Sequence, residues 1–223
     1  MQGDSATFRN GADLRIGFLG GGQLGRMTIQ AALDLDFRIE ILDPDPQCPC
    51  ARISHRFSQG DLNDAQAVID WGRNLDVVTV EIENVSIEGL TALKAMGVQV
   101  LPDPSHLALI RDKGTQKQFY AEHGIPTSDF AVVEDGRAEV LTRGLPVVQK
   151  LRTGGYDGRG VQVIRTEDEA RYAFDAPSLL EDAVDIDKEL SVIVARSTSG
   201  EVKTYPVVAV SYTHLTLPTM FEV

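Results

Sequence analysis

Short apolar runs alternate with segments of helical pattern over the first half of the chain. The apolar runs predict strands, at residues 14–19, 38–42, 77–80 and 98–101. The segments between them predict helices, at residues 26–35, 65–73 and 87–95. Because strands that alternate with helices join through right-handed crossovers, we expect this half to form a parallel α/β sheet of Rossmann-like type.

The second half is richer in strands. Two short helices are predicted first, at residues 105–111 and 115–123, and then four strands, at residues 130–133, 147–149, 161–164 and 179–180. Thr166 and Glu169 have the spacing of a capping box, which predicts the start of another helix. Two last runs are expected to form an antiparallel pair, at residues 189–196 and 203–208. The pattern therefore predicts an α+β unit after the α/β unit.

The composition of the 223 residues is that of a globular protein, with 43% hydrophobic and 24% charged residues. No apolar run approaches the roughly 18 residues of a transmembrane helix, and the N-terminal segment lacks the apolar stretch of a secretion signal. A net charge of −12 argues against broad binding to nucleic acids or membranes. The only cysteines, Cys48 and Cys50, predict two reduced thiols, because they are too close for an ordinary disulfide and too few for zinc. We expect a cytoplasmic protein with small-molecule ligands.

The segment from Lys150 to Gly160, KLRTGGYDGRG, is the most informative motif. One apolar run ends at Lys150 and another begins at Val161, so the glycines are expected at the tip of a hairpin and not at the start of a helix. Glycine adopts the positive φ angles that let backbone N–H groups surround phosphate oxygens. The motif predicts a phosphate-binding loop flanked by cations, and the alternative is a hairpin turn without a ligand.

A second glycine-rich segment, GGGQLG from Gly20 to Gly25, follows a predicted strand and opens a predicted helix. With Asp43 at the end of the next strand, it matches the fingerprint of dinucleotide-binding proteins, which makes NAD one alternative. A GxGxxG match is weak by itself. The broader expectation is a helix N-terminus whose free N–H groups bind another phosphate-bearing ligand, with Gln23 as an additional donor.

Acidic residues follow the strand predicted at residues 77–80. Glu81 and Glu83 come at the carboxyl edge of the sheet, where open α/β sheets bind their ligands. Because side chains alternate along a strand, both are expected on the same side, where they could bind hydroxyl groups or an amine. A solvated surface loop is the alternative.

Two more charged segments surround the hairpin in sequence. The first, DKGTQK from Asp112 to Lys117, lies at a helix junction and is ordinary when taken alone. The second runs from Glu181 to Val184, and its glutamate and backbone groups suit the amino edge and ring nitrogens of adenine. Glu189 is then placed to bind the ribose hydroxyls. Their order along the chain is what favours a nucleotide site.

Taken together, GGGQLGRM, EIENV, DKGTQK, KLRTGGYDGRG and EDAVDIDKELSV resemble the ATP-grasp family over residues 14–209. TGGYDGRG after a strand lysine is the specific element, GGGQLGRM supports it, and EIEN is weaker. The resemblance is greatest to the purine-biosynthetic ligases of this family. It implies ATP- and bicarbonate-dependent carboxylation of 5-aminoimidazole ribonucleotide to 5-carboxyaminoimidazole ribonucleotide, via carboxyphosphate, with Mg²⁺ on the ATP phosphates.

The resemblance also implies roles for individual residues. Those expected to bind ATP are Lys113, Lys150, Gly155, Tyr156, Asp157, Gly158, Arg159, Gly160, Glu181, Asp182, Ala183, Val184 and Glu189. Those expected to bind the ribonucleotide substrate are Gly22, Gln23, Leu24 and Glu81. Tyr156, Asp157 and Arg159 are expected to approach the reacting groups from the lid loop and are the catalytic candidates. The acidic Mg²⁺ ligands are expected beyond this chain, so no metal ligand is assigned within it.

Five segments follow from the resemblance. They are an N-terminal extension (1–13), an α/β substrate-binding domain (14–112), an ATP-grasp lid domain (113–184), the first strands of a truncated third domain (185–209), and a tail (210–223). The tail resembles translated adapter DNA from sequencing libraries, and we expect it to be non-native. We expect the 223 residues alone not to form the product, and the intact enzyme to be a homodimer.

Three alternatives stay open at this point. A sister ligase, such as a formate-dependent glycinamide ribonucleotide transformylase, would use the same scaffold without bicarbonate. An NAD-binding oxidoreductase would depend on Asp43 and not on Lys150. A nucleotide-binding module without ligase activity would bind ATP and not turn it over.

Overall fold

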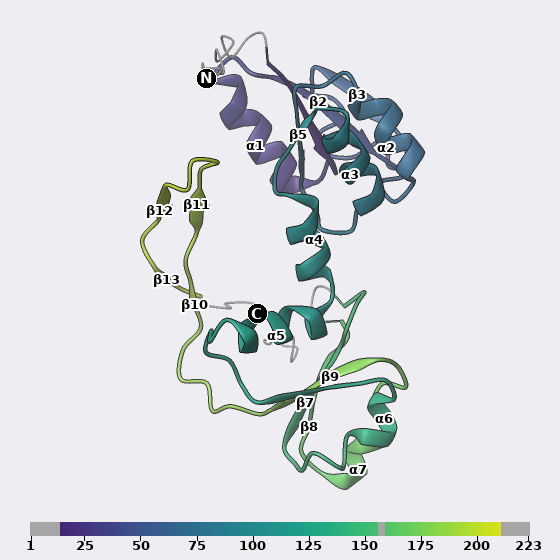
Figure 1. Ribbon diagram of the computed structural model, residues 1–223, viewed down its shortest axis with the longest axis vertical. Coiled ribbons are helices and arrows are strands. Elements are labelled where there is room, and N and C mark those ends of the chain that lie inside the picture. Colours follow the sequence, from purple (N-terminus) through teal and green to yellow (C-terminus); the bar gives the residue numbers. More distant parts are fainter. Residues whose placement is uncertain (1–13, 156–158, 211–223) are drawn as a thin grey trace, which may run out of the picture. The chain divides into compact units, whose positions relative to one another are not determined.

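The computed structural model describes residues 14–155 and 159–210, which form two compact units divided after Asp112 (Figure 1). Unit 1 ends at Asp112 and unit 2 begins at Lys113. Several sequence predictions lie outside the described residues: the extension at 1–13, the loop residues Tyr156, Asp157 and Gly158, and the tail beyond Val210.

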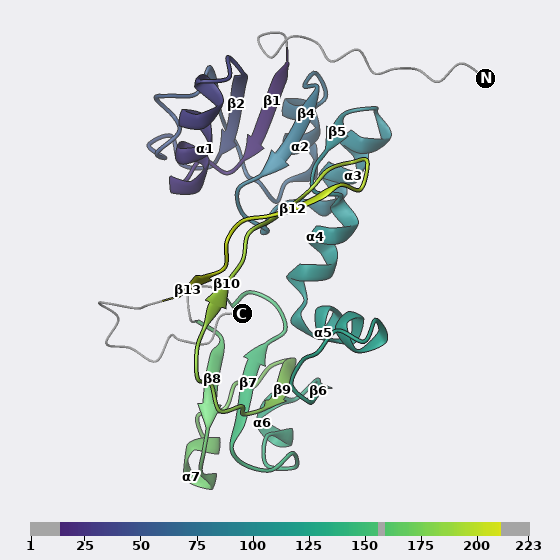
Figure 2. The ribbon, with the colours of Figure 1, turned by 90° about the vertical axis from the view of Figure 1, so that its left-hand side faces the viewer.

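Unit 1 is built on a five-stranded sheet in which every pair of neighbouring strands is parallel, in the order β3-β2-β1-β4-β5. The strands are β1 (Arg15–Leu19), β2 (Arg38–Asp43), β3 (Arg56–Gln59), β4 (Val77–Val80) and β5 (Gln99–Val100). Figure 2 shows β1, β2 and β4 side by side. The predicted parallel α/β fold is confirmed.

Helices cover both faces of this sheet, with α1 on one side and α2 and α3 on the other (Figure 1). They are α1 (Gln23–Leu33), α2 (Ala65–Gly72) and α3 (Ile87–Ala95), and α4 (Pro104–Arg111) follows β5. Buried residues form one apolar cluster on each face. Ile29 packs with Ile39 and Ile41 on the α1 side, and Val68 packs with Leu90 on the other. The inner strands β1, β2 and β4 are therefore covered on both faces, which explains their largely apolar pattern.

Two details of unit 1 differ from the sequence predictions. Strand β3 was not predicted, because RFSQ has no apolar alternation. Its place is set by parallel pairing with β2 and by an ion pair from Arg56 to Glu40 at 3.8 Å. Helix α1 begins at Gln23 and not at Arg26, because Gly22 is its N-cap. Among the described residues, no helix is long and apolar enough to cross a membrane.

Unit 2 contains a four-stranded antiparallel sheet in the order β6-β9-β7-β8. Its strands are β6 (Phe130–Val133), β7 (Val147–Leu151), β8 (Val161–Ile164) and β9 (Ser178–Asp182), and its helices are α5 (Lys113–Glu122), α6 (Gly136–Glu139) and α7 (Glu167–Ala170). Helix α6 was not predicted, and α5 begins at Lys113, earlier than expected. The predicted strands pair as an α+β unit.

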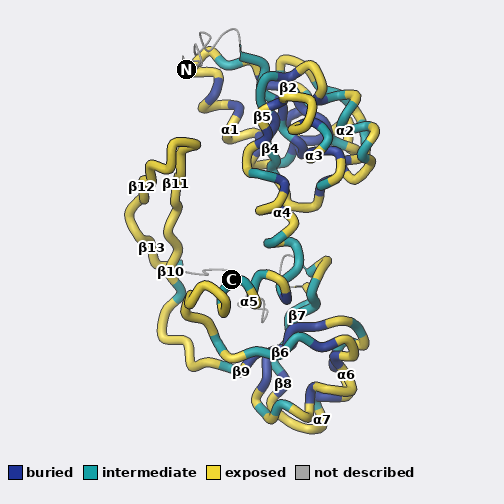
Figure 3. Tube along the Cα trace, in the orientation of Figure 1, coloured by how far each residue is buried: buried dark blue, intermediate teal, exposed yellow. Residues whose placement is uncertain are grey.

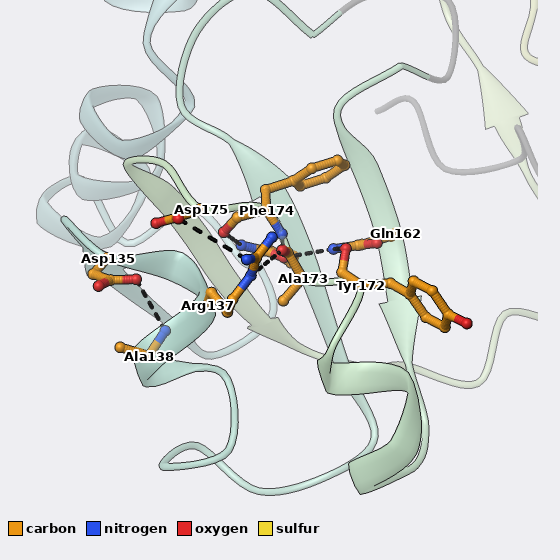
Figure 4. A network of polar contacts seen from close by, with 9 residues as sticks. Asp135, Arg137, Ala138, Gln162, Tyr172, Ala173, Phe174 and Asp175 are labelled. Atoms are coloured by element: carbon orange, nitrogen blue, oxygen red, sulfur yellow. Dashed lines mark hydrogen bonds and ion pairs between the residues drawn. The ribbon is translucent and has the colours of Figure 1, made fainter.

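Polar contacts tie the loop after α7 to the neighbouring elements (Figure 4). Arg137 Nε donates to the Ala173 carbonyl at 2.9 Å, and Gln162 Nε2 donates to the Tyr172 carbonyl at 3.2 Å. Gln149 is fully buried in β7, and its amide bonds both backbone groups of Phe174, at 2.8 and 2.9 Å. These bonds satisfy backbone groups that the short loop cannot pair within itself. They fix the loop after α7 against α6, β7 and β8.

The last described residues form an arm of two short antiparallel ladders. The strands are β10 (Leu190–Ser191), β11 (Val194–Arg196), β12 (Val202–Thr204) and β13 (Val208–Ala209), with β10 paired to β13 and β11 to β12. The predicted antiparallel pairing is present. Every strand residue of the arm is exposed, which Figure 3 shows as a continuous yellow trace.

Candidate functional site

A cleft of about 730 Å³ opens within unit 2. It lies between helix α5, strand β7 and the carboxyl end of strand β9. The residues that line it are Gln116, Lys117, Tyr120, Pro126, Thr127, Ser128, Pro146, Val148, Lys150, Val163, Arg165, Glu181, Asp182, Ala183, Val184, Asp185, Ile186, Lys188, Glu189 and Leu190. Its size is that of a pocket for a small organic ligand.

A buried group of three charges stands in the wall of this cleft. The carboxylate of Glu181 is 5% exposed, and its Oε1 lies 2.5 Å from Lys117 Nζ while its Oε2 lies 2.7 Å from Lys150 Nζ. Both lysine side chains are 13% exposed. Lys117 also donates to the hydroxyl groups of Thr127 and Ser128, the latter at 3.2 Å. Two cations therefore share one anion.

The two lysines decide the charge of Glu181. Burial alone would raise the pKa of this carboxyl, because a charged group is less stable away from water. Hydrogen bonds from Lys117 and Lys150 outweigh burial and hold the pKa below its ordinary value of 4.5. Glu181 is thus ionised at neutral pH, and the group of three carries a net charge of one positive unit.

The glycine-rich segment forms the hairpin that the sequence predicts. Strands β7 and β8 pair antiparallel, with Lys150 opposite Val161. Gly154 and Gly160 have φ angles of +75° and +78°, which side chains other than glycine adopt only with strain. The ammonium group of Lys113 donates to the Gly155 carbonyl at 3.1 Å. This contact ties the start of α5 to the hairpin.

The glycine-rich segment of unit 1 is closed by the protein's own carboxylates. Glu81 accepts hydrogen bonds from the N–H groups of Gly22, at 2.5 Å, and Gly25, at 2.9 Å. Asp43 accepts from the Gly21 N–H at 2.7 Å and from the Asp45 N–H at 2.8 Å. The prediction of free N–H groups at this helix N-terminus is therefore wrong for Gly21, Gly22 and Gly25. Both carboxylate oxygens of Asp43 accept from backbone N–H groups, those of Gly21 and Asp45.

The two cysteines pack against the same loop. Cys48 is 7% exposed and Cys50 is fully buried, and both are free thiols, as predicted. Cys50 Sγ donates to the Gly22 carbonyl at 3.4 Å. Burial, reinforced by the charge of Glu81, raises the pKa of Cys50 to about 11. The thiols are thus protonated packing groups at neutral pH.

Comparison with known proteins agrees with this geometry. A model of the ribonucleotide synthetase preATP-grasp domain matches residues 14–111, and a model of the ATP-grasp domain matches residues 118–216. The chain belongs to the ATP-grasp family. It spans about half the length, or less, of the curated relatives it matches.

Three relatives illustrate the likeness to other ATP-grasp proteins. N5-carboxyaminoimidazole ribonucleotide synthase of Synechococcus elongatus is 37% identical over 200 residues, which are 86% of this chain and 51% of that protein. The Staphylococcus aureus N5-carboxyaminoimidazole synthetase complexed with ADP has a TM-score of 0.84 at 29% identity, over 90% of this chain and 55% of that one. The Aspergillus clavatus synthase in complex with ADP and 5-aminoimidazole ribonucleotide has a TM-score of 0.80 at 31% identity, over 91% and 55%.

The structure brings together six of the residues that the ATP-grasp resemblance assigned to ATP. Those that line the cleft are Lys150, Glu181, Asp182, Ala183, Val184 and Glu189. Lys113, Gly155, Arg159 and Gly160 belong to the hairpin and the start of α5 and do not line the cleft as described. Asp182 is fixed by Arg143, whose Nε lies 2.9 Å from its Oδ1. This ion pair anchors the segment that follows β9.

The substrate candidates lie together in unit 1, at the start of α1 and at the carboxyl end of β4. Gly22 is the N-cap of α1. A Cβ at this position would lie 2.7 Å from Glu81 Oε1, so only glycine leaves room for the carboxylate. Gln23 and Leu24 are exposed, Leu24 to 66%. Glu83 is exposed. Glu81 is thus the one acid of the EIEN segment that the fold directs into the glycine loop.

The sequence pattern predicts a role for Lys113 of the DKGTQK segment and none for Lys117. In helix α5 the two lysines are four residues apart, so they lie on one face of the helix. The partner that decides the role of Lys117, Glu181, is 64 positions further along (181 − 117). No local pattern could have indicated that contact.

The described residues do not fit a magnesium site by themselves. Among residues 14–155 and 159–210, no group of three histidine, cysteine or acidic side chains is arranged to hold a metal ion. Mg²⁺ in proteins is held by carboxylates and phosphate oxygens in octahedral geometry. No chemical step is therefore assigned to a metal on this chain.

Proposed function

We propose that this chain carries the nucleotide-binding part of an ATP-dependent ligase of purine biosynthesis. The enzyme would use ATP and bicarbonate to carboxylate 5-aminoimidazole ribonucleotide, by way of carboxyphosphate, and would release 5-carboxyaminoimidazole ribonucleotide. The observation that supports it best is the cleft of unit 2, in which Lys117 and Lys150 share Glu181 beside the hairpin of glycines. The ADP-bound relatives of the same fold agree with it.

The chemistry of this site follows from its charges. Transfer of a phosphoryl group to bicarbonate needs little covalent help from the protein, and depends on positioning and on charge neutralisation. Lys150 lies one residue before the end of strand β7, and its ammonium group lines the cleft, where it can contact phosphate oxygens. The backbone N–H and C=O groups of the segment from Asp182 to Val184 would bind the adenine base. Glu189 lines the same cleft and would bind the ribose hydroxyls.

Unit 1 is proposed to bind the ribonucleotide through Glu81 and its neighbours. The carboxylate holds the loop N–H groups of Gly22 and Gly25 and keeps further lone pairs for a hydroxyl or amine of the substrate. Gln23 and Leu24 are exposed beside it. The cytoplasmic location, the dimer and Mg²⁺ remain predictions.

The nucleotide assignment is tested by titrating the 223-residue chain with ATP, ADP and NAD in a calorimeter. We expect ATP and ADP to bind and NAD not to bind. Lys150→Ala should weaken ATP binding by about tenfold or more, the size of one lost charge-assisted hydrogen bond. Lys203→Ala, an exposed lysine of the arm, is the matched control. Tighter binding of NAD than of ATP would contradict the proposal.

The substrate class is tested separately, because a sister ligase acting on glycinamide ribonucleotide has the same scaffold. We expect 5-aminoimidazole ribonucleotide to perturb the NMR signals of Gly22, Gly25 and Glu81, and glycinamide ribonucleotide to bind more weakly. The reverse order of affinity would favour the formate-dependent reaction.

A further inference from the structure

The charged group in the wall of the cleft has two cations and one anion. The proposed function by itself does not require the second cation. One carboxylate would suffice to neutralise one buried lysine. Here Glu181 divides its two oxygens between Lys117 and Lys150, and both ammonium groups lie in side chains that are 13% exposed. A buried excess of positive charge is unfavourable unless an anion compensates it. The cleft beside the group is where such an anion can enter.

The two lysines are held differently. Lys117 comes from α5 and has three oxygen partners, Glu181 Oε1 and the hydroxyl groups of Thr127 and Ser128. Lys150 comes from β7, and its described partner is Glu181 Oε2 at 2.7 Å. Lys117 is thus fixed by the protein, whereas Lys150 stands where the strand enters the glycine-rich hairpin. An arriving phosphate would meet Lys150 more readily than Lys117.

We propose that Lys117 is a positioning residue. Its ammonium group pairs with one carboxylate oxygen of Glu181, so that Glu181 neutralises Lys150 only in part and the charge of Lys150 stays available to the anionic part of the ligand. The inference rests on the proposed function, since the anion is taken to be a nucleotide phosphate. Without Lys117, Glu181 and Lys150 would form a one-to-one pair with no net charge. A phosphate would then have to compete with Glu181 for its cation.

A direct contact between Lys117 and the ligand makes a different prediction. If Lys117 acts through Glu181, removing the negative charge of Glu181 as well should release Lys150 and restore binding. If Lys117 touches the ligand itself, the second substitution should restore nothing. A purely structural role would change stability and leave the affinity of the folded fraction unaltered. The double variant therefore separates the three roles.

The experiment is an NMR titration of the 223-residue chain with ATP and, separately, with inorganic tripolyphosphate, which has no base to contact Glu181. We expect Lys117→Met to weaken tripolyphosphate binding by about tenfold or more. Lys117→Arg should retain binding, because it keeps the charge on Glu181. Lys117→Met combined with Glu181→Gln should return the affinity to within about threefold of the unaltered chain, which corresponds to less than about 0.7 kcal/mol.

Folding is checked in each variant by the dispersion of the amide signals and by the thermal midpoint, and Lys203→Met is the charge-matched control. Unchanged binding by Lys117→Met would overturn the inference and leave the proposed function standing, as would a double variant as weak as the single one. If the unaltered chain binds neither ATP nor tripolyphosphate, the proposed function fails first and this inference with it.

Discussion

The two glycine-rich segments of this chain look alike in sequence and are opposite in electrostatics. In unit 1, Glu81 accepts from the N–H groups of Gly22 and Gly25, and Asp43 accepts from that of Gly21, so two carboxylates lie against the loop. In unit 2, Lys113 donates a hydrogen bond to Gly155 of the hairpin, and Lys150 of strand β7 lies where the hairpin begins. The first segment is closed by acids and the second is accompanied by cations.

Glycine content therefore does not identify a phosphate site. Backbone N–H groups of a glycine-rich loop bind any anion that reaches them, and a carboxylate of the same protein is always present at high effective concentration. Where the fold supplies such a carboxylate, a free phosphate must displace it. The charge of the side chains that the fold places beside the loop decides whether the loop binds phosphate groups or hydroxyl groups.

The largest expected effect comes from opening the loop of unit 1. Glu81→Ala removes the acceptor of two N–H groups at the start of α1, and we expect unit 1 to lose about 2–3 kcal/mol of unfolding free energy. The freed N–H groups should then bind anions, so that phosphate should raise the thermal midpoint of the variant and not that of the unaltered chain. Thermal melts with and without phosphate at equal ionic strength measure both effects.

Glu83→Ala is the matched control for this experiment, since Glu83 is an exposed acid two residues away. Its stability and its response to phosphate should equal those of the unaltered chain. Equal stability of Glu81→Ala and the unaltered chain would show that the carboxylate does not close the loop in solution.

A smaller effect is expected from the hairpin of unit 2. Gly160→Ala places a Cβ at a φ of +78° and within 3.0 Å of both the Gly155 Cα and the Leu151 side chain, and we expect a loss of about 1–3 kcal/mol. Gly200→Ala, at a φ of +89° with no neighbour within 4 Å, isolates the strain of the backbone alone and should cost less. Denaturant unfolding compares them, and an equal loss would mean that the close contact at Gly160 has no cost.

The smallest expected effect is on acid stability. Because the pKa of Glu181 is lowered in the folded state, unit 2 gains stability above the ordinary value of 4.5 and loses it as pH falls through the folded pKa. Hydrogen bonds from Lys94 and Ser105 lower the pKa of Asp103 in unit 1, with the same sign. The side chain of Asp103 is 32% exposed, so salt should weaken its effect, whereas the buried Glu181 should be less sensitive.

Hydrogen exchange of each unit between pH 3 and 6 (roughly the range that brackets an ordinary carboxyl pKa), at low and high salt, measures this difference. Glu181→Gln should flatten the pH dependence of unit 2 and leave that of unit 1 unchanged. A pH dependence of unit 2 that survives this substitution would show that other acids are responsible.

Sequence by itself determined the regular architecture. Strands that are covered on both faces of a parallel sheet have a largely apolar sequence, as residues 77–80 do, and so four of the five strands of unit 1 could be predicted. The hairpin at Lys150 to Gly160 could also be predicted locally, because two short apolar runs joined by glycines favour an antiparallel pair.

Tertiary structure alone decided the charges of the two loops. Glu81 lies 59 residues from Gly22, and Glu181 lies 64 residues from Lys117 (181 − 117), so neither contact leaves a local trace in sequence. Hydrophobic periodicity reports which face of an element is buried, and says nothing of which polar side chain from another element will meet it there. Strand β3 and the role of Lys117 were missed on that account, since pairing and ionic partners arise only when distant segments are packed together.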